Sequence, residues 1–138
     1  MDNSKIMGDI TKNFNRYEFR CFHCATEGID LAFVVKLQEL REVVEHPIYI
    51  LSGYRCAKHP IEMAKYDINP RRTTGTHVLG IASDICCPDL SLSNFAAIIQ
   101  SSGIFTGVGV DKQRNFVHVD TKNRQLVWTY KNGRPVYG

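Results

Sequence analysis

The fold class is decided by the segment from 105 to 130, Phe105-Thr-Gly-Val-Gly-Val-Asp-Lys-Gln-Arg-Asn-Phe-Val-His-Val-Asp-Thr-Lys-Asn-Arg-Gln-Leu-Val-Trp-Thr-Tyr130. Its three stretches at 105–110, 115–120 and 125–130 are rich in β-branched and aromatic residues, and short polar links separate them. This pattern is typical of strands joined by tight turns, so we predict an antiparallel meander. Asn132-Gly133, a frequent hairpin dipeptide, follows the third stretch.

Two amphipathic segments outside this region predict helices. Residues 30–45 carry apolar side chains at helical spacing, with Asp30 placed to cap the start and Pro47 beyond the end. Residues 91–102 predict a second helix, with Phe95, Ile98 and Ile99 facing inward and Gly103 at the position of a C-terminal cap. These helices favour an α+β fold, an antiparallel sheet meander with helices packed on it.

Three shorter segments complete the expected fold. Residues 48–51 and 81–87 predict strands, and the polar segment 58–76 predicts a long loop with one or two helical turns near 61–66. A chain of 138 residues with 43% hydrophobic content suits one domain over residues 1–138. Such a domain buries roughly two-thirds of its unfolded surface.

Charge and hydropathy restrict the partners. The formal charge of +3 comes from 17 basic and 14 acidic residues scattered along the chain, so no nucleic-acid partner is expected. The sequence has neither an apolar run long enough to span a membrane nor a recognisable signal peptide. We therefore expect a monomer without a membrane partner that accumulates in the cytoplasm of the producing cell.

The five cysteines are an odd number, which argues against a complete disulfide framework and favours reduced thiols. Cys21 and Cys24 have the spacing of half a zinc knuckle with His23 between them, but we identify no second pair of the usual kind. A second metal site there is left open. Adjacent Cys86 and Cys87 would point to opposite faces of a strand, one into the core and one toward the functional site.

Two stretches carry the chemistry: His77-Val-Leu-Gly80-Ile-Ala82-Ser-Asp84 and Phe116-Val-His118-Val-Asp120. A single histidine in a strand is more often a surface or hydrogen-bonded group than a metal ligand. Two imidazoles and the Asp84 carboxylate together, however, make three zinc ligands and leave a fourth tetrahedral position open for water, as in catalytic sites. Pairing of the two strands would place His118 opposite Asp84.

Two further stretches, Ser52-Gly53-Tyr54-Arg55 and Trp128-x-Tyr130, flank those that carry the chemistry. Together the four stretches resemble the zinc D-Ala-D-Ala carboxypeptidase family, in particular its small phage and bacterial members. The resemblance covers roughly residues 14 to 130. It implies a Hedgehog amino-terminal-like fold, zinc bound by His77, Asp84 and His118, and peptidoglycan stem peptides as substrate. The stretches that carry it are His77-x-x-Gly80-x-Ala82-x-Asp84, Ser52-Gly53-Tyr54-Arg55, Phe116-Val-His118-Val-Asp120 and Trp128-x-Tyr130.

The resemblance also suggests catalytic residues. Arg55 corresponds to an arginine that binds a substrate carboxylate or steadies the oxyanion, although an exposed loop arginine is the alternative. Many relatives carry an acid three residues before the second histidine, where this chain has Asn115. Asp120 is then either the general base or an acceptor that orients His118 or Arg55.

Other ring side chains are kept outside the catalytic set. His23 and His59 are more simply surface histidines, and aromatic residues at strand spacing, such as Trp128 and Tyr130, are mostly core. Tyr54 is treated in the same way.

Two functions follow from these residues. The first is a zinc peptidase that cleaves bonds of D-amino acids in peptidoglycan, as a carboxypeptidase or as an endolysin-type endopeptidase of a phage that reaches the cell wall after release. The second is a zinc-stabilised cell-wall-binding or virion module with weak or no activity, which Asn115 favours.

Overall fold

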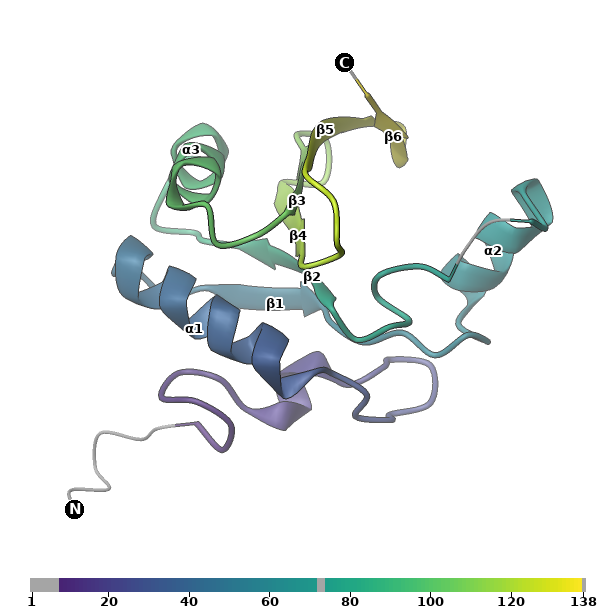
Figure 1. The fold of residues 1–138 in the computed structure, drawn as a ribbon, viewed down its shortest axis with the longest axis horizontal. Coiled ribbons are helices and arrows are strands. Elements are labelled where there is room, and N and C mark those ends of the chain that lie inside the picture. The colour runs from purple at the N-terminus through teal and green to yellow at the C-terminus, as the bar shows by residue number, and fades with distance from the viewer. Residues whose placement is uncertain (1–7, 72–73, 138) are drawn as a thin grey trace.

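The computed structural model describes residues 8–71 and 74–137 (Figure 1). Residues 1–7 and 138 of the expected domain, and residues 72 and 73 of the expected long loop, lie outside the described residues. The elements are η2 (Arg16–Phe19), α1 (Leu31–Val44), β1 (Tyr49–Ser52), α2 (Pro60–Ile68), β2 (Ala82–Cys86), α3 (Leu92–Ser102), β3 (Gly107–Asp111), β4 (Phe116–Asp120), β5 (Leu126–Lys131) and β6 (Arg134–Val136).

The strands form one mixed sheet in the order β1-β2-β4-β3-β5-β6. The α+β prediction is confirmed, but the meander is wrong, because β5 pairs with β3 in parallel instead of with β4. The reason is that β2 already pairs with the other edge of β4. The chain leaving β4 therefore reaches the free edge of β3, where the backbone N–H of Leu126 donates to the carbonyl of Thr106 at 2.9 Å.

The structure confirms the predicted caps Asp30 of α1 and Gly103 of α3, and it shows that Ser91, expected as the first residue of α3, is the N-terminal cap of that helix. The Asp30 side chain accepts from the backbone N–H of Ala32 at 2.9 Å, and the Ser91 side chain accepts from Asn94 N–H at 3.1 Å. Gly103 ends α3 in the left-handed conformation, with φ of 66°.

Helix α2 is longer than the one or two turns expected there. The His59 side chain accepts from the backbone N–H of Ile61 at 3.1 Å, and Pro60 occupies the first helical position. Proline suits that position because its fixed φ is already helical and its missing N–H would have no partner there. Histidine is not among the preferred capping residues, so His59 was a weak signal for a helix start.

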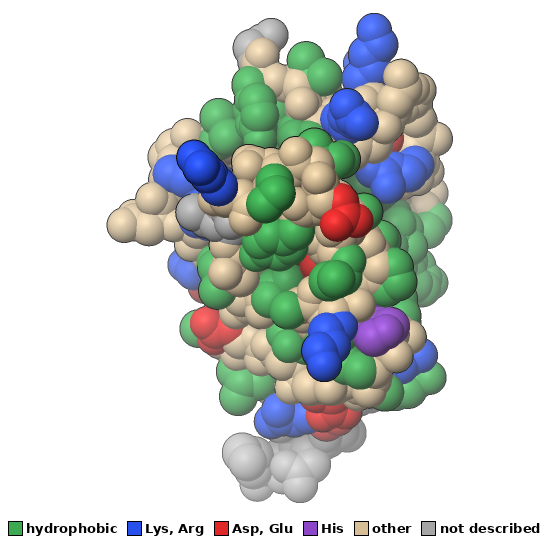
Figure 2. Space-filling view, turned by 90° about the vertical axis from the view of Figure 1, so that its right-hand side faces the viewer, with side chains coloured by type: hydrophobic (Ala, Val, Ile, Leu, Met, Phe, Trp, Pro, Cys, Tyr) green, Lys and Arg blue, Asp and Glu red, His purple; other side chains and the backbone are tan. Residues whose placement is uncertain are grey.

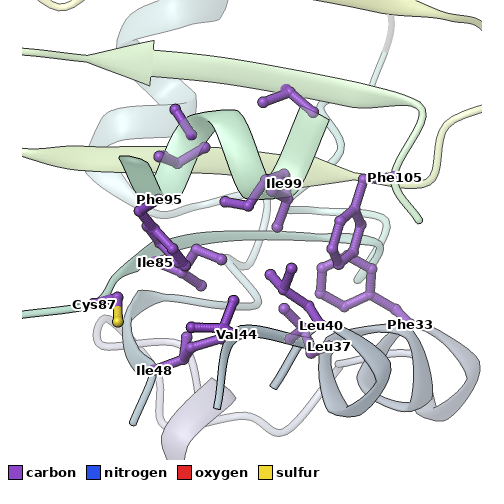
Figure 3. Close-up of a cluster of buried hydrophobic side chains, with 14 of the residues drawn as sticks. Phe33, Leu37, Leu40, Val44, Ile48, Ile85, Cys87, Phe95, Ile99 and Phe105 are labelled. Carbon is purple, nitrogen blue, oxygen red and sulfur yellow. The ribbon is translucent and has the colours of Figure 1, made fainter. Parts of the chain in front are cut away.

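The hydrophobic core lies between the sheet and helices α1 and α3 (Figure 3). Phe33 of α1 packs against Phe105 with ring centroids 5.8 Å apart. Phe95 and Ile99 of α3 are buried as predicted, while Ile98 is half-buried. Helix α2 lies on the opposite side of the molecule from α3 (Figure 1). Within the described ranges, no helix combines the length and the apolar character needed to cross a bilayer.

Alternation along the strands separates this core from a second, polar face. Ile85 of β2 and Val117 and Val119 of β4 point into the core. Since neighbouring side chains in a strand point to opposite faces, Asp84 and His118 point to the other face of the sheet. That face carries the candidate site.

Gly80 brings the loop before β2 against the N-terminal part of the chain. Its φ is 75°, and a Cβ there would overlap the carbonyl oxygen of Gly28. Gly103 has a similar φ of 66° but open space around it, so it is a matched control. We expect Gly103→Ala to lower the free energy of unfolding by about 1–2 kcal/mol and Gly80→Ala by a further ~1–3 kcal/mol from overpacking. Urea titration measures both, and equal losses would contradict the close approach.

Candidate metal centre

The strand register brings Asp84 and His118 together. In the antiparallel pair of β2 and β4, Asp84 lies directly opposite His118, which confirms the pairing predicted from the sequence. His77 reaches the same point from the loop before β2. One ligand atom from each of the three side chains lies within 4.8 Å of the others, and all three side chains are buried.

The backbone fixes the orientation of His77. Its Nδ1 lies 2.8 Å from the carbonyl oxygen of Gly53, and its Nε2 lies 3.3 Å from Oδ1 of Asp84. A carbonyl oxygen only accepts, so Nδ1 carries the hydrogen and Nε2 presents its lone pair toward Asp84. A metal-binding imidazole uses its second nitrogen in this way.

His118 is oriented by two carboxylates. Its Nδ1 lies 3.1 Å from Oδ1 of Asp84, and its Nε2 lies 2.8 Å from Oδ2 of Asp120. The hydrogen bond to Asp120 leaves Nδ1 as the nitrogen that faces Asp84 and His77. Burial alone would lower the pKa of His118, but the hydrogen bonds to Asp120 and Asp84 raise it.

The donor set fits a zinc ion. Two imidazole nitrogens and one carboxylate oxygen are ligands that zinc prefers, and three protein ligands are characteristic of its catalytic sites. Burial lowers the pKa of His77, which favours the neutral, ligating imidazole. Burial would raise the pKa of Asp84, but His77 and His118 hold it well below its usual range, so the carboxylate is ionised.

Asp120 is enclosed by donors. Besides His118, it accepts from Arg124 Nη1 at 2.6 Å and Nη2 at 3.0 Å, and from the backbone N–H of Lys122 at 3.1 Å. A Cβ on Gly107 of β3 would strike this carboxylate, so the glycine makes room for it. Burial opposes ionisation of Asp120, but the hydrogen bonds from His118 and Arg124 hold its pKa well below the usual range.

Arg55 is buried beside the candidate metal ligands His77, Asp84 and His118, so the alternative of an exposed loop arginine is wrong. Its Nη2 donates to Oδ2 of Asp84 at 3.2 Å, its Nη1 to Oε2 of Glu62 at 3.1 Å, and its Nε to Oγ of Ser52 at 3.1 Å. Glu62 also accepts from Nζ of Lys65 at 2.8 Å. The guanidinium is thus held in one orientation by three acceptors.

Glu62 and Arg124 were missed by the sequence analysis. Glu62 lies within the helical turns expected near 61–66, but the sequence pattern there did not show that its side chain is buried. Arg124 lies in the link after β4, four residues beyond Asp120. That spacing from an acidic residue was the one available signal, and it is weak outside a helix.

The three side chains open into a cleft of about 730 Å³. This volume lies within the roughly 300–1,000 Å³ usual for ligand sites. The acidic side chains lining it are Asp84 and Asp120, whereas the cationic ones are more numerous. Figure 2 shows Lys and Arg around hydrophobic surface on the side of the molecule that carries α2. The cationic residues of the lining are Arg55, Lys65, Arg114, Lys122, Arg124 and Arg134.

Trp128 and Tyr130 line this cleft, and Trp128 is also buried, as expected for an aromatic residue in a strand. The Trp128 ring lies 5.3 Å from that of His118, between centroids. Tyr54 instead packs on Gly28, where a Cβ would come within 2.6 Å of its ring. The cleft therefore has an aromatic wall next to the metal-binding group.

Asn115 does not line this cleft. It lines a smaller cavity of about 120 Å³ together with Cys86, Cys87 and Phe95, whereas the metal-binding group opens into the large cleft. Cys87 is part of the core as predicted, whereas Cys86, two residues beyond Asp84 in β2, lines this smaller cavity. The position three residues before His118 thus contributes no group to the cleft.

Three candidate metal ligands that open into a cleft have the arrangement found in catalytic zinc sites, among them those of metal-dependent hydrolases. The family model described as Peptidase M15 matches residues 12–120. The chain therefore belongs to the M15 peptidases, the zinc D-Ala-D-Ala carboxypeptidase type, as the resemblance in the sequence indicated. No curated protein matches the chain. Membership in this zinc-dependent family supports a metallopeptidase.

Proposed function

We propose that this chain is a zinc peptidase that hydrolyses D-amino-acid-containing bonds of peptidoglycan stem peptides, within a single domain over residues 1–138. The observation that carries the proposal is the meeting of His77, Asp84 and His118 within 4.8 Å at the floor of a cleft. The cationic lining supports an anionic substrate, and stem peptides carry free carboxylates. Such an enzyme would act on the cell wall after release from the producing cell.

Each side chain of the group has a defined task in this proposal. His77 would bind zinc through Nε2, His118 through Nδ1 and Asp84 through Oδ1. Zinc held there supplies a Lewis acid for the scissile carbonyl and a water of lowered pKa. The chain itself provides the fixed orientation, since Gly53 and Asp120 hold the two imidazoles by their other nitrogens.

Arg55 would bind the substrate at the edge of the metal-binding group. Its Nη2 lies next to Asp84, and its side chain lines the cleft. A planar guanidinium that is already held by Glu62 and Ser52 loses little freedom when it donates to a carboxylate or to a carbonyl oxygen that gains charge. We therefore assign Arg55 to substrate carboxylate binding or oxyanion stabilisation.

Asp120 would orient His118 and would not act as the general base. Its oxygens already accept four hydrogen bonds, and a carboxylate with a depressed pKa is a weak proton acceptor.

Asp120→Asn keeps an oxygen for His118, so we expect activity within about tenfold of wild type, whereas Asp120→Ala should weaken zinc binding by about 10–100-fold. Loss of ~10²–10⁴-fold in turnover by Asp120→Asn with zinc retained would instead indicate a base.

A second function, a zinc-stabilised wall-binding module with weak activity, is favoured by one observation. Among the described residues that line the cleft, the acidic side chains are a proposed ligand, Asp84, and the enclosed Asp120. A carboxylate free to take a proton from water is therefore not offered by this lining, and slow turnover would follow.

The two functions are separated by one experiment. The zinc-loaded protein is incubated with purified peptidoglycan and with a peptide ending in D-Ala-D-Ala, and newly released amino groups are measured. The peptidase predicts release that His118→Ala abolishes. Tight binding of the peptide without release would favour the module, and release that survives His118→Ala would refute a metal mechanism.

A further inference from the structure

Three cysteines from two distant segments meet outside the cleft. Cys21 and Cys24 lie in the loop after η2, and Cys56 directly follows Arg55. Their sulfur atoms all lie within 4.8 Å of one another, and each is a free thiol. We propose that these three sulfurs, together with the imidazole of His23, form a second, structural zinc site. This site is independent of the proposed function.

The spacing of the sulfurs suits a zinc ion. Zn–S distances of about 2.3 Å place two thiolates on one tetrahedral ion roughly 3.7 Å apart. Three sulfurs mutually within 4.8 Å therefore reach this arrangement with small side-chain rotations. Three cysteines and one histidine are a standard closed ligand set of structural zinc.

The backbone around Cys21 supports a thiolate. The N–H of Cys56 donates to Sγ of Cys21 at 3.2 Å, which stabilises negative charge on that sulfur. The N–H of Ala25 donates to the carbonyl of Cys21 at 2.7 Å, and Ala25 has a left-handed φ of 61°. This tight turn folds Cys24 back toward Cys21.

His23 and His59 are the two candidates for the fourth ligand of this site. His23 Nδ1 lies 3.3 Å from Sγ of Cys56, close to the roughly 3.5 Å expected for nitrogen and sulfur on one zinc ion. His59 follows Cys56 at the same spacing that separates Cys21 from Cys24, a pair that the sequence analysis overlooked. However, Nδ1 of His59 accepts from the backbone of Ile61, so the hydrogen of its neutral ring is on Nε2 and neither nitrogen is free.

A zinc ion here would join the N-terminal loop to the loop that carries Arg55. The two loops already touch, because the backbone N–H of Tyr54 donates to the carbonyl of Phe19 at 2.9 Å. At Gly53, a Cβ would lie 2.7 Å from Cα of Phe19, so the backbones are packed closely. The site would therefore tie these two loops together outside the cleft.

The test measures zinc content and cobalt absorption. Wild-type protein is expected to bind two zinc ions per chain, Cys24→Ser one, and the control Cys86→Ser two. Because His77→Ala removes the ion of the cleft, its remaining ion reports the cysteine site alone. Cobalt in place of zinc should give thiolate-to-cobalt absorption in the near ultraviolet, which the two imidazoles and the carboxylate of the cleft cannot produce.

The variants separate the cysteine site from the site in the cleft. The cobalt absorption should persist in His77→Ala and His59→Ala and weaken in His23→Ala. Wild-type protein with reduced thiols that shows no thiolate absorption would overturn the proposal, as would Cys24→Ser that retains two zinc ions. Absorption lost in His59→Ala but kept in His23→Ala would overturn the assignment of the fourth ligand. Loss of the cleft ion alone would contradict the proposed function and leave this site intact.

Discussion

Replacing His118 by alanine is expected to abolish hydrolysis and remove one zinc ion from the protein. The side chain provides Nδ1 at 3.1 Å from Asp84 and is one of three candidate ligands. A Lewis acid supplies several kcal/mol of transition-state stabilisation. At about 1.36 kcal/mol per factor of ten, its loss lowers the rate by ~10³-fold or more. Amino-group release from peptidoglycan and zinc content measure the two effects.

His46→Ala is the matched control for this substitution. His46 also faces a carboxylate, Asp89 at 3.3 Å, but on the surface of the molecule. Its replacement should leave zinc content and hydrolysis unchanged. Equal zinc content in the His118→Ala and His46→Ala proteins, with His118→Ala still folded by circular dichroism, would refute the role of His118 as a ligand.

Arg55→Ala is expected to have the second largest effect. It should lower both the free energy of unfolding and the rate of hydrolysis. The substitution removes the guanidinium from buried Glu62, whose other cationic partner in the described part of the chain is Lys65. Removing one member of a buried ion pair costs about 3–5 kcal/mol, because the other charge stays buried. Denaturant unfolding should show a loss near the lower end, since Lys65 remains.

Arg55→Lys tests whether charge alone is sufficient at this position, and Arg16→Ala is the control at an exposed arginine. Lysine keeps the charge but lacks the planar group that contacts Ser52, Glu62 and Asp84 together, so we expect partial stability with much reduced hydrolysis. Arg16 is exposed in η2 and should be replaceable by alanine at little cost. Full activity of Arg55→Lys would show that charge alone is sufficient at this position.

The sequence predicted that Asp84 and His118 meet, because their positions are tied to strand geometry. The alternation of β2 and β4 places Asp84 and His118 on one face, and antiparallel pairing then puts them opposite each other. The predicted caps were also local features, since Asp30 accepts from a backbone N–H two residues away and Gly103 directly follows the last residue of α3. Strand alternation and helix capping were therefore sufficient to predict these features from the sequence.

The remaining parts depend on contacts between distant segments. The parallel pairing of β5 with β3 follows from the occupation of β4 by β2, which periodicity along one strand does not reveal. The inward position of Glu62 requires α2 to form, and its partner Arg55 lies in another element. The meeting of Cys56 with Cys21 across 35 positions likewise appears only in the folded chain.

Anomalous diffraction at the zinc edge, from crystals grown with zinc, tests the central claim most directly. The account predicts a peak about 2.0–2.2 Å from His77 Nε2, His118 Nδ1 and an oxygen of Asp84. A peak confined to the cysteines, or a cleft without anomalous density beside these three side chains at saturating zinc, would contradict it.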